Sequence, residues 1–338
     1  MATPIFAVTT RGLEAISAAE MRASGLVVSR IGYRRIEAAC DDLGAVSRLR
    51  TADDVFVHVG GWDEIGHTRD ELKRLTTFSA ALDLEPALAA VRQIRPLPCP
   101  IHFSVTANFV GRRNYTAPEI KAAVAQGLMQ QRGEWLYTDD DTEAAINLRV
   151  FMEHTEATIG VRALSQPLHR RLYKQQHIPG SLKPTVAAAM LHIAGAEAGM
   201  RLVDTFCGAG TIPLEAAFMG AWAVGGDMDA EVLRAARANA RGAEVPPRFL
   251  RWDATRLPLV SGAVNVAVTN PPWGRQIEVN AGLQSLYRQA FDELRRVVRP
   301  GGPIVMLTTY PELIDATPAE QIEISLYGQT PVIVRYVG

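Results

Sequence analysis

Hydrophobic and polar positions change their period several times along the chain, and the changes predict an α/β protein. Near the start, "IFAVTT" is strand-like, and "GLEAISAAEMRAS" repeats apolar residues at helical spacing. "VVSRIGYRRIEAAC" predicts a hairpin, and "LGAVSRLRTA" predicts a short helix. The mixed segment "DVFVHVGGWDEI", the helical "ALDLEPALAAVRQI" and the strand "IHFSVTANF" follow. We expect a small α/β domain to about residue 55 and a second to about residue 162.

From residue 185 onward, strands and helices alternate in the pattern of a doubly covered sheet. "MRLVDTFCGAGTIPLEAAFMG" is a strand, a glycine turn and a helix, and "AWAVGGDMDAEVLRAARANARG" repeats the order. Alternation of this kind predicts a mostly parallel sheet with helices on both faces. "ISLYGQTPVIVRYV" predicts a terminal antiparallel hairpin at one edge of that sheet.

The stretch between these two patterns is basic and broken by proline and glycine. No acidic residue lies between Glu156 and Glu197, and "SQPLHRRLYKQQHIPGSLKPT" has the composition of a linker. A basic linker with aromatic residues can follow a phosphate backbone. A solvated linker with chance charge is an equally good interpretation of Arg170, Arg171 and Lys174.

Composition narrows the function classes without choosing one. The formal net charge is −1, so nucleic-acid binding would require a local basic patch. The three cysteines are far apart, and the histidines lack metal-ligand spacing, so no metal is expected. No apolar run is long enough to span a bilayer, and no signal peptide begins the sequence. A cytoplasmic protein is the expectation.

The ends of the predicted parallel strands carry the candidate chemistry, since ligands of open α/β sheets bind there. Asp204 closes the first strand, and Gly208 and Gly210 form the turn into a helix. The third glycine of a dinucleotide fingerprint is missing, and an aspartate here would oppose a pyrophosphate. S-adenosylmethionine suits such a loop because it carries a sulfonium and an ammonium but no phosphate.

Two further strand ends place acids near the same edge. Asp227 in "VGGDMD" lies where a carboxylate can accept hydrogen bonds from ribose hydroxyls, although an exposed turn is the alternative. Asp253 in "RWDATRLPL" could accept from an adenine amino group while Ala254 supplies a backbone N–H. A helix N-cap is nearly as good an interpretation of Asp253.

The segment "NVAVTNPPWGRQ" ends the fourth strand with an unusual set of residues. The side-chain oxygen of Asn270 and the carbonyl of Pro271 can together accept hydrogen bonds from a planar NH2 group. This would aim the nitrogen lone pair at a methyl donor and stabilise the charge that develops. Trp273 offers a face on which a flipped base can stack.

"DTFCGAGTIPLEAA" followed about sixty residues later by "NPPWG" resembles the class I methyltransferases that methylate amino groups. The resemblance implies a C-terminal Rossmann-like domain that binds S-adenosylmethionine. "SLKPTVAAAML" resembles the family's helix before the cofactor loop, which implies a methionine-end contact near Lys183, Pro184 and Thr185. The resemblance also places at the cofactor Phe206, Thr211 and Met228, beside the acids and glycines already named, and Asn270.

The amino-terminal half resembles a THUMP domain and the small domain before it. "GLEAISAAEM" is similar to the start of that small domain, and "FSVTANFVGRRNYTAPEIKAAVAQGL" to part of a THUMP domain. The division then expected is a ferredoxin-like α/β domain (1–55), a THUMP domain (56–162), a basic linker (163–182) and a class I methyltransferase domain (183–338). The candidate RNA contacts of the THUMP region are Arg112, Arg113 and Lys121, for which a solvated helix face is equally plausible.

The whole chain is therefore similar to THUMP-containing guanine-N2 methyltransferases, including those that modify guanosine 6 of tRNA. Leu172 departs from this family, which usually has glycine there. The resemblance implies a monomer that methylates tRNA, with an rRNA guanine-N2 methyltransferase as the alternative. An adenine-N6 or protein glutamine methyltransferase fits less well because neither needs a THUMP domain. A catalytically dead RNA-binding protein is opposed by the intact motifs, and an NAD-dependent enzyme by the missing glycine.

Overall fold

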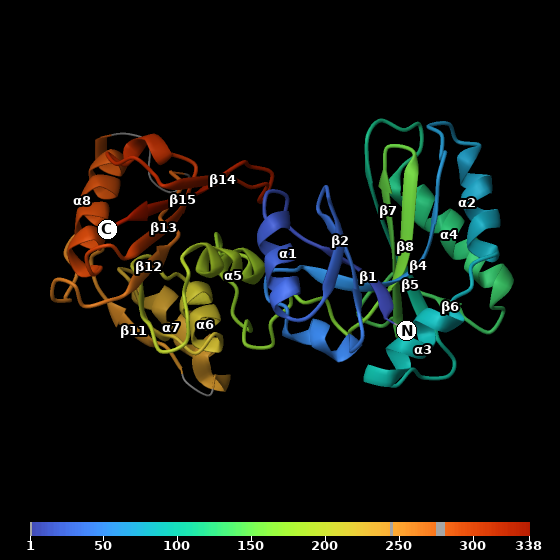
Figure 1. Ribbon diagram of the computed structural model, residues 1–338, viewed down its shortest axis with the longest axis horizontal. Helices are drawn as coiled ribbons and strands as arrows, with labels where there is room; N and C mark the ends of the chain where they lie inside the picture. The colour runs from blue at the N-terminus through green and yellow to red at the C-terminus, as the bar shows by residue number, and fades with distance from the viewer. Residues whose placement is uncertain (1, 244–245, 275–280) are drawn as a thin grey trace. The chain divides into compact units, whose positions relative to one another are not determined.

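The computed structural model describes residues 2–243, 246–274 and 281–338, and the chain divides into two compact units (Figure 1). Unit 1 comprises Met1–Val8 and Glu20–Leu168, and unit 2 comprises Thr9–Ala19 and His169–Gly338. The division therefore falls inside the first helix, α1 (Glu14–Ala23). Within the described part of the chain, no helix is long and apolar enough to cross a membrane.

Unit 1 is built on an eight-stranded sheet in the order β2-β3-β1-β4-β8-β7-β5-β6. Its strands are β1 (Thr3–Val8), β2 (Val27–Gly32), β3 (Arg35–Cys40), β4 (Asp54–Trp62), β5 (His102–Val110), β6 (Leu136–Tyr137), β7 (Ile146–Glu153) and β8 (Glu156–Arg162). The predicted hairpin is β2 with β3, whereas β5 pairs in parallel with β6 and β7. Residue 55 lies within β4, which pairs with β1, so the strands of the first two expected domains share one sheet. The four-domain division stays a prediction.

The helices of unit 1 are α2 (Glu71–Ala80), α3 (Glu85–Ile94) and α4 (Ala117–Gln131), and the predicted helix after β3 is a 3₁₀ helix, η1 (Leu43–Arg48). A capping box begins α4, in which the Thr116 backbone N–H donates to Glu119 Oε2 at 2.8 Å. Helices α2 and α4 lie side by side (Figure 1) because Gly127 lets their backbones approach. A Cβ at Gly127 would lie 2.3 Å from the Thr76 carbonyl oxygen.

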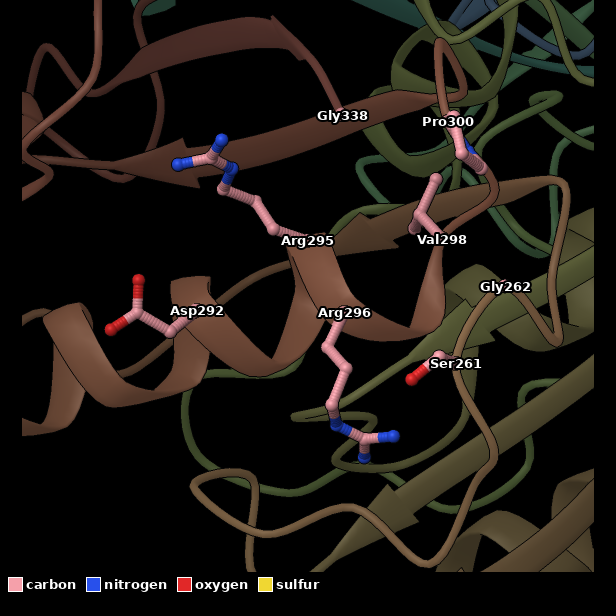
Figure 2. A pocket seen from close by; sticks show the side chains of 8 residues that line it. All are labelled: Ser261, Gly262, Asp292, Arg295, Arg296, Val298, Pro300 and Gly338. Carbon is pink, nitrogen blue, oxygen red and sulfur yellow. The ribbon is translucent and has the colours of Figure 1, made fainter.

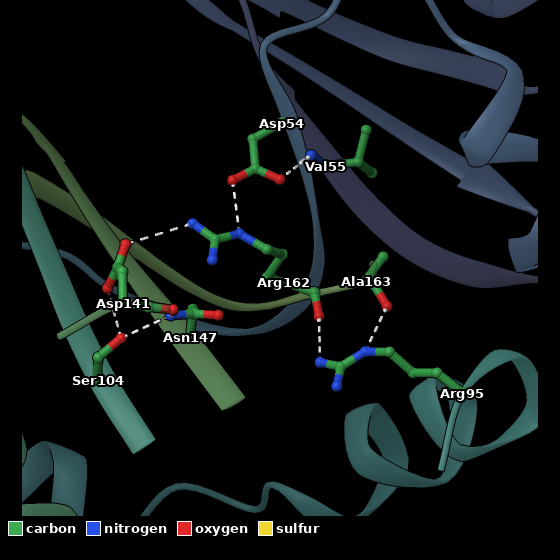
Figure 3. A network of polar contacts seen from close by, with 8 residues as sticks. All are labelled: Asp54, Val55, Arg95, Ser104, Asp141, Asn147, Arg162 and Ala163. Atoms are coloured by element: carbon green, nitrogen blue, oxygen red, sulfur yellow. Dashed lines mark hydrogen bonds and ion pairs between the residues drawn. The ribbon is translucent and has the colours of Figure 1, made fainter. Parts of the chain in front are cut away.

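A buried polar network closes one end of the unit 1 sheet (Figure 3). Arg162 Nε donates to Asp54 Oδ2 at 2.8 Å, and Arg162 NH2 lies 3.5 Å from Asp141 Oδ2. Burial raises the pKa of Asp54 to about 6, against the opposing effect of the Arg162 guanidinium. Arg95, which follows α3, donates to the carbonyls of Ala145, Arg162 and Ala163. The guanidinium of Arg162 therefore pairs with the buried carboxylate of Asp54 and with the partly exposed carboxylate of Asp141.

Unit 2 contains a seven-stranded sheet in the order β11-β10-β9-β12-β13-β15-β14. Its strands are β9 (Arg201–Asp204), β10 (Trp222–Asp227), β11 (Arg248–Arg251), β12 (Val266–Thr269), β13 (Pro303–Thr308), β14 (Glu320–Glu323) and β15 (Val332–Val337). The first five in spatial order pair in parallel, and β15 pairs antiparallel with both β13 and β14. The predicted fold class is confirmed. The terminal hairpin begins earlier than predicted, because β14 ends before Ile324.

Helices cover both faces of this sheet, as alternation along β12 shows. The helices are α5 (Pro184–Ile193), α6 (Thr211–Phe218), α7 (Ala230–Asn239) and α8 (Ala281–Val297), with short 3₁₀ helices η2 (Ala240–Gly242) and η3 (Pro311–Leu313). Val266 and Val268 share one buried cluster with α5 residues, whereas Ala267 belongs to the cluster that contains α8 residues. Successive residues of a strand face opposite sides of the sheet, so helices cover both faces. Residues on both faces are therefore buried, which explains why the strand sequences are continuous apolar runs.

The segment Thr9–Ala19 packs within unit 2, although it precedes most of unit 1 in sequence. Leu13 is fully buried in the cluster that contains α5 residues, and the Ser325 N–H donates to the Arg11 carbonyl at 3.1 Å. Gly12 has a φ of +93°, and a Cβ there would lie 2.1 Å from the Glu323 carbonyl oxygen. Only glycine permits this approach of two backbones.

Candidate active site

The carboxyl ends of β10, β9 and β12 meet at one edge of the unit 2 sheet, since these strands are adjacent and parallel. Asp227 ends β10, Asp204 ends β9, and Asn270 directly follows β12. The strand order reverses between β9 and β12, which is where open α/β sheets form their binding crevice. Three side chains predicted from widely separated motifs thus lie at a single edge.

Asp204 is a buried carboxylate that organises the loop after β9. It is 1% exposed, and its Oδ1 accepts from Thr269 Oγ1 at 2.7 Å and from the Phe206 N–H at 3.2 Å. Burial raises the pKa of Asp204 to about 7, the nearby Asp227 carboxylate adds to the rise, and the two hydrogen bonds oppose it. Asp204 therefore ties the loop to the end of β12.

The raised pKa predicts a pH-dependent effect of Asp204→Asn on stability. The folded protein binds a proton at Asp204 more tightly than the unfolded chain does, so charging this group costs stability as the pH rises from about 4 to about 7. Asparagine retains an acceptor for Thr269 and avoids this cost. The melting temperature of the variant minus that of the natural protein should therefore be more positive at pH 8 than at pH 5. A difference that is equal at the two pH values, measured by scanning calorimetry, would contradict the assignment.

The glycine turn after β9 leads into α6 with two residues in the left-handed region. Gly208 has a φ of +53° and Gly210 a φ of +82°, and α6 begins at Thr211. A Cβ at Gly210 would lie 2.8 Å from Phe249 Cζ, so glycine is required there for packing as well as for conformation. The helix start leaves backbone N–H groups available for a ligand.

Asp227 connects this turn to the end of β10. Its Oδ2 accepts from the Gly208 N–H at 3.1 Å, and its Oδ1 accepts from the Asp229 N–H at 3.1 Å. Asp227 is partly exposed and Met228 is 63% exposed, so a carboxylate and an apolar side chain both face outward here. These groups suit the hydroxyls and the ring of a nucleoside.

Asp253 and Ala254 follow β11 and its buried Trp252. Asp253 Oδ1 accepts from the Thr255 N–H at 2.9 Å and from Thr255 Oγ1 at 2.7 Å, which caps a turn rather than a helix. Ala254 is 3% exposed. One oxygen of Asp253 is thus used locally, and the predicted adenine contact would fall to the other.

The loop after β12 is anchored on both sides. Trp273 Nε1 donates to Asn270 Oδ1 at 3.0 Å and to the Leu307 carbonyl at 3.2 Å. From α8, the Tyr287 hydroxyl donates to the Pro272 carbonyl at 3.1 Å. An amide oxygen has two lone pairs, so Asn270 Oδ1 can accept a second hydrogen bond from an amine. Of the quoted segment, Arg275 and Gln276 lie outside the described residues.

At the start of α5, Pro184 and Thr185 are buried, and Thr185 is fully so. Lys183, which precedes them, places its Nζ 3.5 Å from Thr10 Oγ1. The predicted contact with the methionine end of a cofactor would therefore involve backbone groups at Pro184 and Thr185 more readily than their side chains.

Comparison with known proteins identifies the family. A family model described as an RMKL-like methyltransferase domain matches residues 171–324. The tRNA (guanine(6)-N2)-methyltransferase of Thermus thermophilus is 35% identical over 252 residues, which cover 71% of this chain and 74% of the relative. The chain therefore belongs to the family of the tRNA guanine-N2 methyltransferases. It is a methyltransferase, and the cofactor of its class is S-adenosylmethionine.

Two further comparisons, one with a solved structure and one with a sequence relative, agree with this family. The crystal structure of TrmN from Thermus thermophilus matches with a TM-score of 0.81 and 27% identity, and 98% of each chain is covered. The bovine tRNA (guanine(6)-N(2))-methyltransferase THUMP3 is 28% identical over 62% of this chain but only 44% of its own length. The likeness to TrmN thus extends through both units.

S-adenosylmethionine fits the edge that the structure describes. The side chains gathered there are the carboxylates of Asp204 and Asp227, the amide of Asn270 and the apolar Met228. None of these four is basic, as expected for a cationic ligand without phosphates. No cluster of three or more potential metal ligands occurs among the described residues of the methyltransferase.

The basic linker of the methyltransferase is only partly available to a substrate. Arg171 Nε lies 3.0 Å from Glu215 Oε1, and the two side chains are 8% and 0% exposed. Lys174 Nζ donates to the Leu182 carbonyl, and burial lowers the pKa of Lys174 to about 8 while Glu215 opposes the shift. Arg170 is exposed, as is Leu172 at 87%. Of the three predicted cations, Arg170 is the one whose residue is exposed.

In unit 1, the three predicted RNA contacts also differ in availability. Arg112 is exposed. Arg113 donates to the Tyr115 hydroxyl at 2.7 Å and to the carbonyls of Gly66 and His154. Lys121 Nζ lies 2.7 Å from Asp139 Oδ1, which raises the pKa of Lys121. Arg113 thus connects its own loop to the loops that contain Gly66 and His154, whereas Arg112 is exposed to solvent.

Three residues that the sequence patterns did not single out hold the site together. Thr269 bonds Asp204, Tyr287 holds the loop after β12, and Glu215 neutralises Arg171. Glu215 had one signal, since it is an acid within an otherwise apolar helix, "TIPLEAAF". Thr269 and Tyr287 had no such signal.

A separate hollow of about 600 Å³ lies at the opposite end of the unit 2 strands (Figure 2). Its lining includes Ser261, which precedes β12, Arg295 in the last turn of α8, and Pro300, which precedes β13. The predicted site residues follow the carboxyl ends of the same strands. This hollow is therefore not the methyl-transfer site.

Proposed function

We propose that this methyltransferase transfers a methyl group from S-adenosylmethionine to the exocyclic N2 amine of guanosine 6 in the acceptor stem of tRNA. The arrangement of Asn270 beside Asp204 and Asp227, at the reversal of strand order, supports amine methylation. The choice of guanine and of tRNA is supported by the 35% identity to the Thermus thermophilus enzyme over most of both chains. We further propose that the enzyme is cytoplasmic and acts as a monomer.

Each residue at the edge takes a distinct role in this proposal. Asp227 accepts hydrogen bonds from the ribose hydroxyls, and the turn from Phe206 through Gly208 and Gly210 to Thr211 follows the cofactor's methionine part. Met228 packs on the adenine, and the second carboxylate oxygen of Asp253, Oδ2, accepts from the adenine amine while the Ala254 N–H donates to the ring. Asp204 holds the turn in place by accepting a hydrogen bond from the Phe206 N–H. When bound, S-adenosylmethionine supplies a methyl group activated by its sulfonium.

Asn270 and Pro271 then hold the substrate nitrogen. A guanine amine has its lone pair delocalised into the ring, so it is a weak nucleophile. Two acceptors, Asn270 Oδ1 and the Pro271 carbonyl, orient the two N–H bonds and leave the lone pair directed at the methyl group. The same oxygens stabilise the positive charge that grows on nitrogen. The extra proton can leave to water, so no side chain is required as a general base.

The position of the target base is the finer part of the proposal. The tRNA (guanine(10)-N2)-dimethyltransferase of Methanothermobacter thermautotrophicus is 34% identical over 48% of this chain, so guanosine 10 is the natural competitor. The test uses tRNA transcripts in which position 6 or position 10 alone is replaced, with pairing preserved. Loss of methylation only on replacing guanosine 6 is expected. Loss only on replacing guanosine 10 would overturn the assignment of position.

A second RNA class is favoured by one observation. The mouse U6 snRNA (guanine-N(2))-methyltransferase THUMPD2 is 33% identical over 48% of this chain and 30% of its own length. Guanine N2 is the acceptor in that relative too, so the chemistry proposed for Asn270 would be unchanged. Transcripts of small nuclear RNA and of rRNA belong in the same assay as tRNA.

The linker prediction can be tested with charge reversal at Arg170. Arg170→Glu should weaken tRNA binding about tenfold and lower the salt slope of binding by about one, while cofactor affinity is unchanged. Arg295→Glu is the matched control, because Arg295 is exposed at the other end of the unit 2 strands. Equal tRNA affinity of the two variants and the natural protein, by filter binding, would show that Arg170 does not contact RNA.

Arg171→Glu is expected to behave differently from Arg170→Glu. It would place a second carboxylate beside the fully buried Glu215. Arg171→Glu should therefore lower the melting temperature of the protein, measured by scanning calorimetry, whereas Arg170→Glu should leave it unchanged.

A further inference from the structure

The indole N–H of Trp273 makes a contact that the stacking role predicted from the sequence does not require. It lies 3.0 Å from Asn270 Oδ1 and 3.2 Å from the Leu307 carbonyl oxygen of β13. The ring is partly buried and packs on the core cluster that contains α5 residues. One donor is therefore shared between the proposed catalytic amide and the neighbouring strand.

We propose that Trp273 is a positioning residue that acts through this N–H to fix the orientation of the Asn270 side-chain amide. The inference rests on the proposed function, because it assigns a role in the same amine-methylating site. It goes beyond that function because it gives the indole N–H a role of its own, distinct from stacking of a base on the aromatic face.

The argument begins with the two ends of an amide side chain. Asn270 carries an oxygen that accepts and an NH2 group that donates, and a half-turn of the side chain exchanges them. With the oxygen toward Trp273, the indole N–H meets an acceptor. With the amide reversed, that N–H would face another donor and lose its hydrogen bond to Asn270. The indole therefore favours the orientation in which Oδ1 occupies the observed place.

The orientation matters because the proposed substrate group is also a donor. An amine can hydrogen-bond to the remaining lone pair of Asn270 Oδ1 but not to the Nδ2 hydrogens while its own lone pair is directed at the methyl group. A reversed amide would present donors to the substrate nitrogen and would misalign it. Trp273 thus fixes the productive orientation of the Asn270 amide before the substrate binds. The free energy needed to organise the site in the transition state is lowered accordingly.

The indole is itself held in place, which a positioning role requires. Its N–H reaches the Leu307 carbonyl of β13, and its ring rests on the buried cluster. On the other side, the Tyr287 hydroxyl contacts the Pro272 carbonyl and Thr308 Oγ1, at 3.1 and 2.9 Å. The loop from Asn270 to Trp273 is therefore clamped between β13 and α8, so the amide has a fixed reference.

The test removes the N–H while retaining an aromatic ring. Trp273→Phe keeps a ring without a donor, and replacement of Trp273 by benzothienylalanine keeps the size of the indole with sulfur in place of the N–H. Both should lower single-turnover methylation of tRNA about tenfold, with KM for tRNA and Kd for S-adenosylmethionine changed less than about threefold. Unchanged melting temperatures would show that the fold is intact.

A double-mutant cycle with Asn270→Ala distinguishes action through Asn270 from action on the base. If the N–H works through Asn270, Trp273→Phe should change the residual rate of the Asn270→Ala variant less than about twofold. Multiplicative losses in the double variant would overturn the inference, as would full activity of the benzothienylalanine protein. A rise confined to KM for tRNA would also overturn it and would assign stacking instead.

The two proposals fail in different ways in this experiment. If the natural protein forms no N2-methylguanosine in tRNA, the proposed function is wrong and this inference falls with it. If the natural protein is active and the ring variants match its rate, only the role of the indole N–H is wrong.

Discussion

Asn270→Ala is expected to lower kcat for tRNA methylation about 100- to 1000-fold while Kd for S-adenosylmethionine changes less than about threefold. The side chain is the acceptor that would orient and stabilise the reacting nitrogen, and alanine leaves the amine with the Pro271 carbonyl alone. The magnitude corresponds to the loss of one preorganised electrostatic contact at a developing charge. The cofactor contacts proposed for Asp227 and the glycine turn lie on other strand ends and remain.

Asn270→Asp is the matched control for this variant. Aspartate keeps an acceptor for the indole N–H of Trp273, 3.0 Å away in the natural protein, and keeps a second lone pair for the amine. It should therefore retain more activity than alanine in single-turnover assays, although its charge changes the environment of the site. Turnover of Asn270→Ala equal to that of the natural protein would contradict the proposed mechanism.

Arg162→Met is expected to lower the free energy of unfolding of unit 1 by about 3–5 kcal/mol. The side chain of Arg162 is 6% exposed, and its guanidinium lies within 2.8 Å of Asp54 Oδ2 and 3.5 Å of Asp141 Oδ2. Methionine fills similar space but leaves the buried Asp54 carboxylate without its guanidinium partner, whereas the partly exposed Asp141 still accepts from Ser104. Burial already raises the pKa of Asp54 to about 6 against the opposing guanidinium, so removal of Arg162 should raise it further.

The sign of the pH dependence follows from that pKa. At pH 5 Asp54 is largely protonated in the folded protein, and a neutral carboxyl needs no cationic partner. The destabilisation by Arg162→Met should therefore be larger at pH 8 than at pH 5 in urea unfolding monitored by hydrogen exchange of unit 1. The double variant Asp54→Asn with Arg162→Met should recover part of the loss. A loss below about 1 kcal/mol at pH 8 would show that the pair does not stabilise the unit.

Local patterns predicted the unit 2 fold well because each strand and helix carries its own periodicity. The apolar runs of β9, β12 and β13 and the helix between "DTFCGAG" and the next strand are all short-range signals. Helix α2 was not predicted, since "ELKRLTTFSA" is largely polar and its packing depends on Gly127 of α4. The place of Thr9–Ala19 in unit 2 could not be predicted either, because it depends on the approach of Gly12 to Glu323, far along the chain.

The candidate site shows the same division between local and long-range information. Motif spacing indicated which strand ends carry Asp204, Asp227 and Asn270, and their adjacency follows from the strand order. The bonds that hold these side chains, from Thr269 and Trp273, depend on side-chain geometry that no pattern specifies. The roles assigned to the individual residues stay predictions.

Charge patterns were less informative than strand ends. A run of arginines and lysines in the sequence predicts an RNA-binding surface. The run looks the same whether its side chains face solvent or the protein interior. Arg171 faces the buried Glu215, an acid within α6, and Arg113 faces the carbonyls of Gly66 and His154, which belong to two other loops. Burial of a cation is decided by such distant partners, so the linker sequence alone could not separate Arg170 from Arg171.

The most direct test of guanine-N2 methylation of tRNA is transfer of label from S-adenosylmethionine to unmodified total tRNA and, separately, to rRNA, followed by nucleoside analysis. Labelled N2-methylguanosine in tRNA, and not in rRNA, is the predicted result. Label in rRNA alone, or on a nucleoside other than guanosine, would contradict the account.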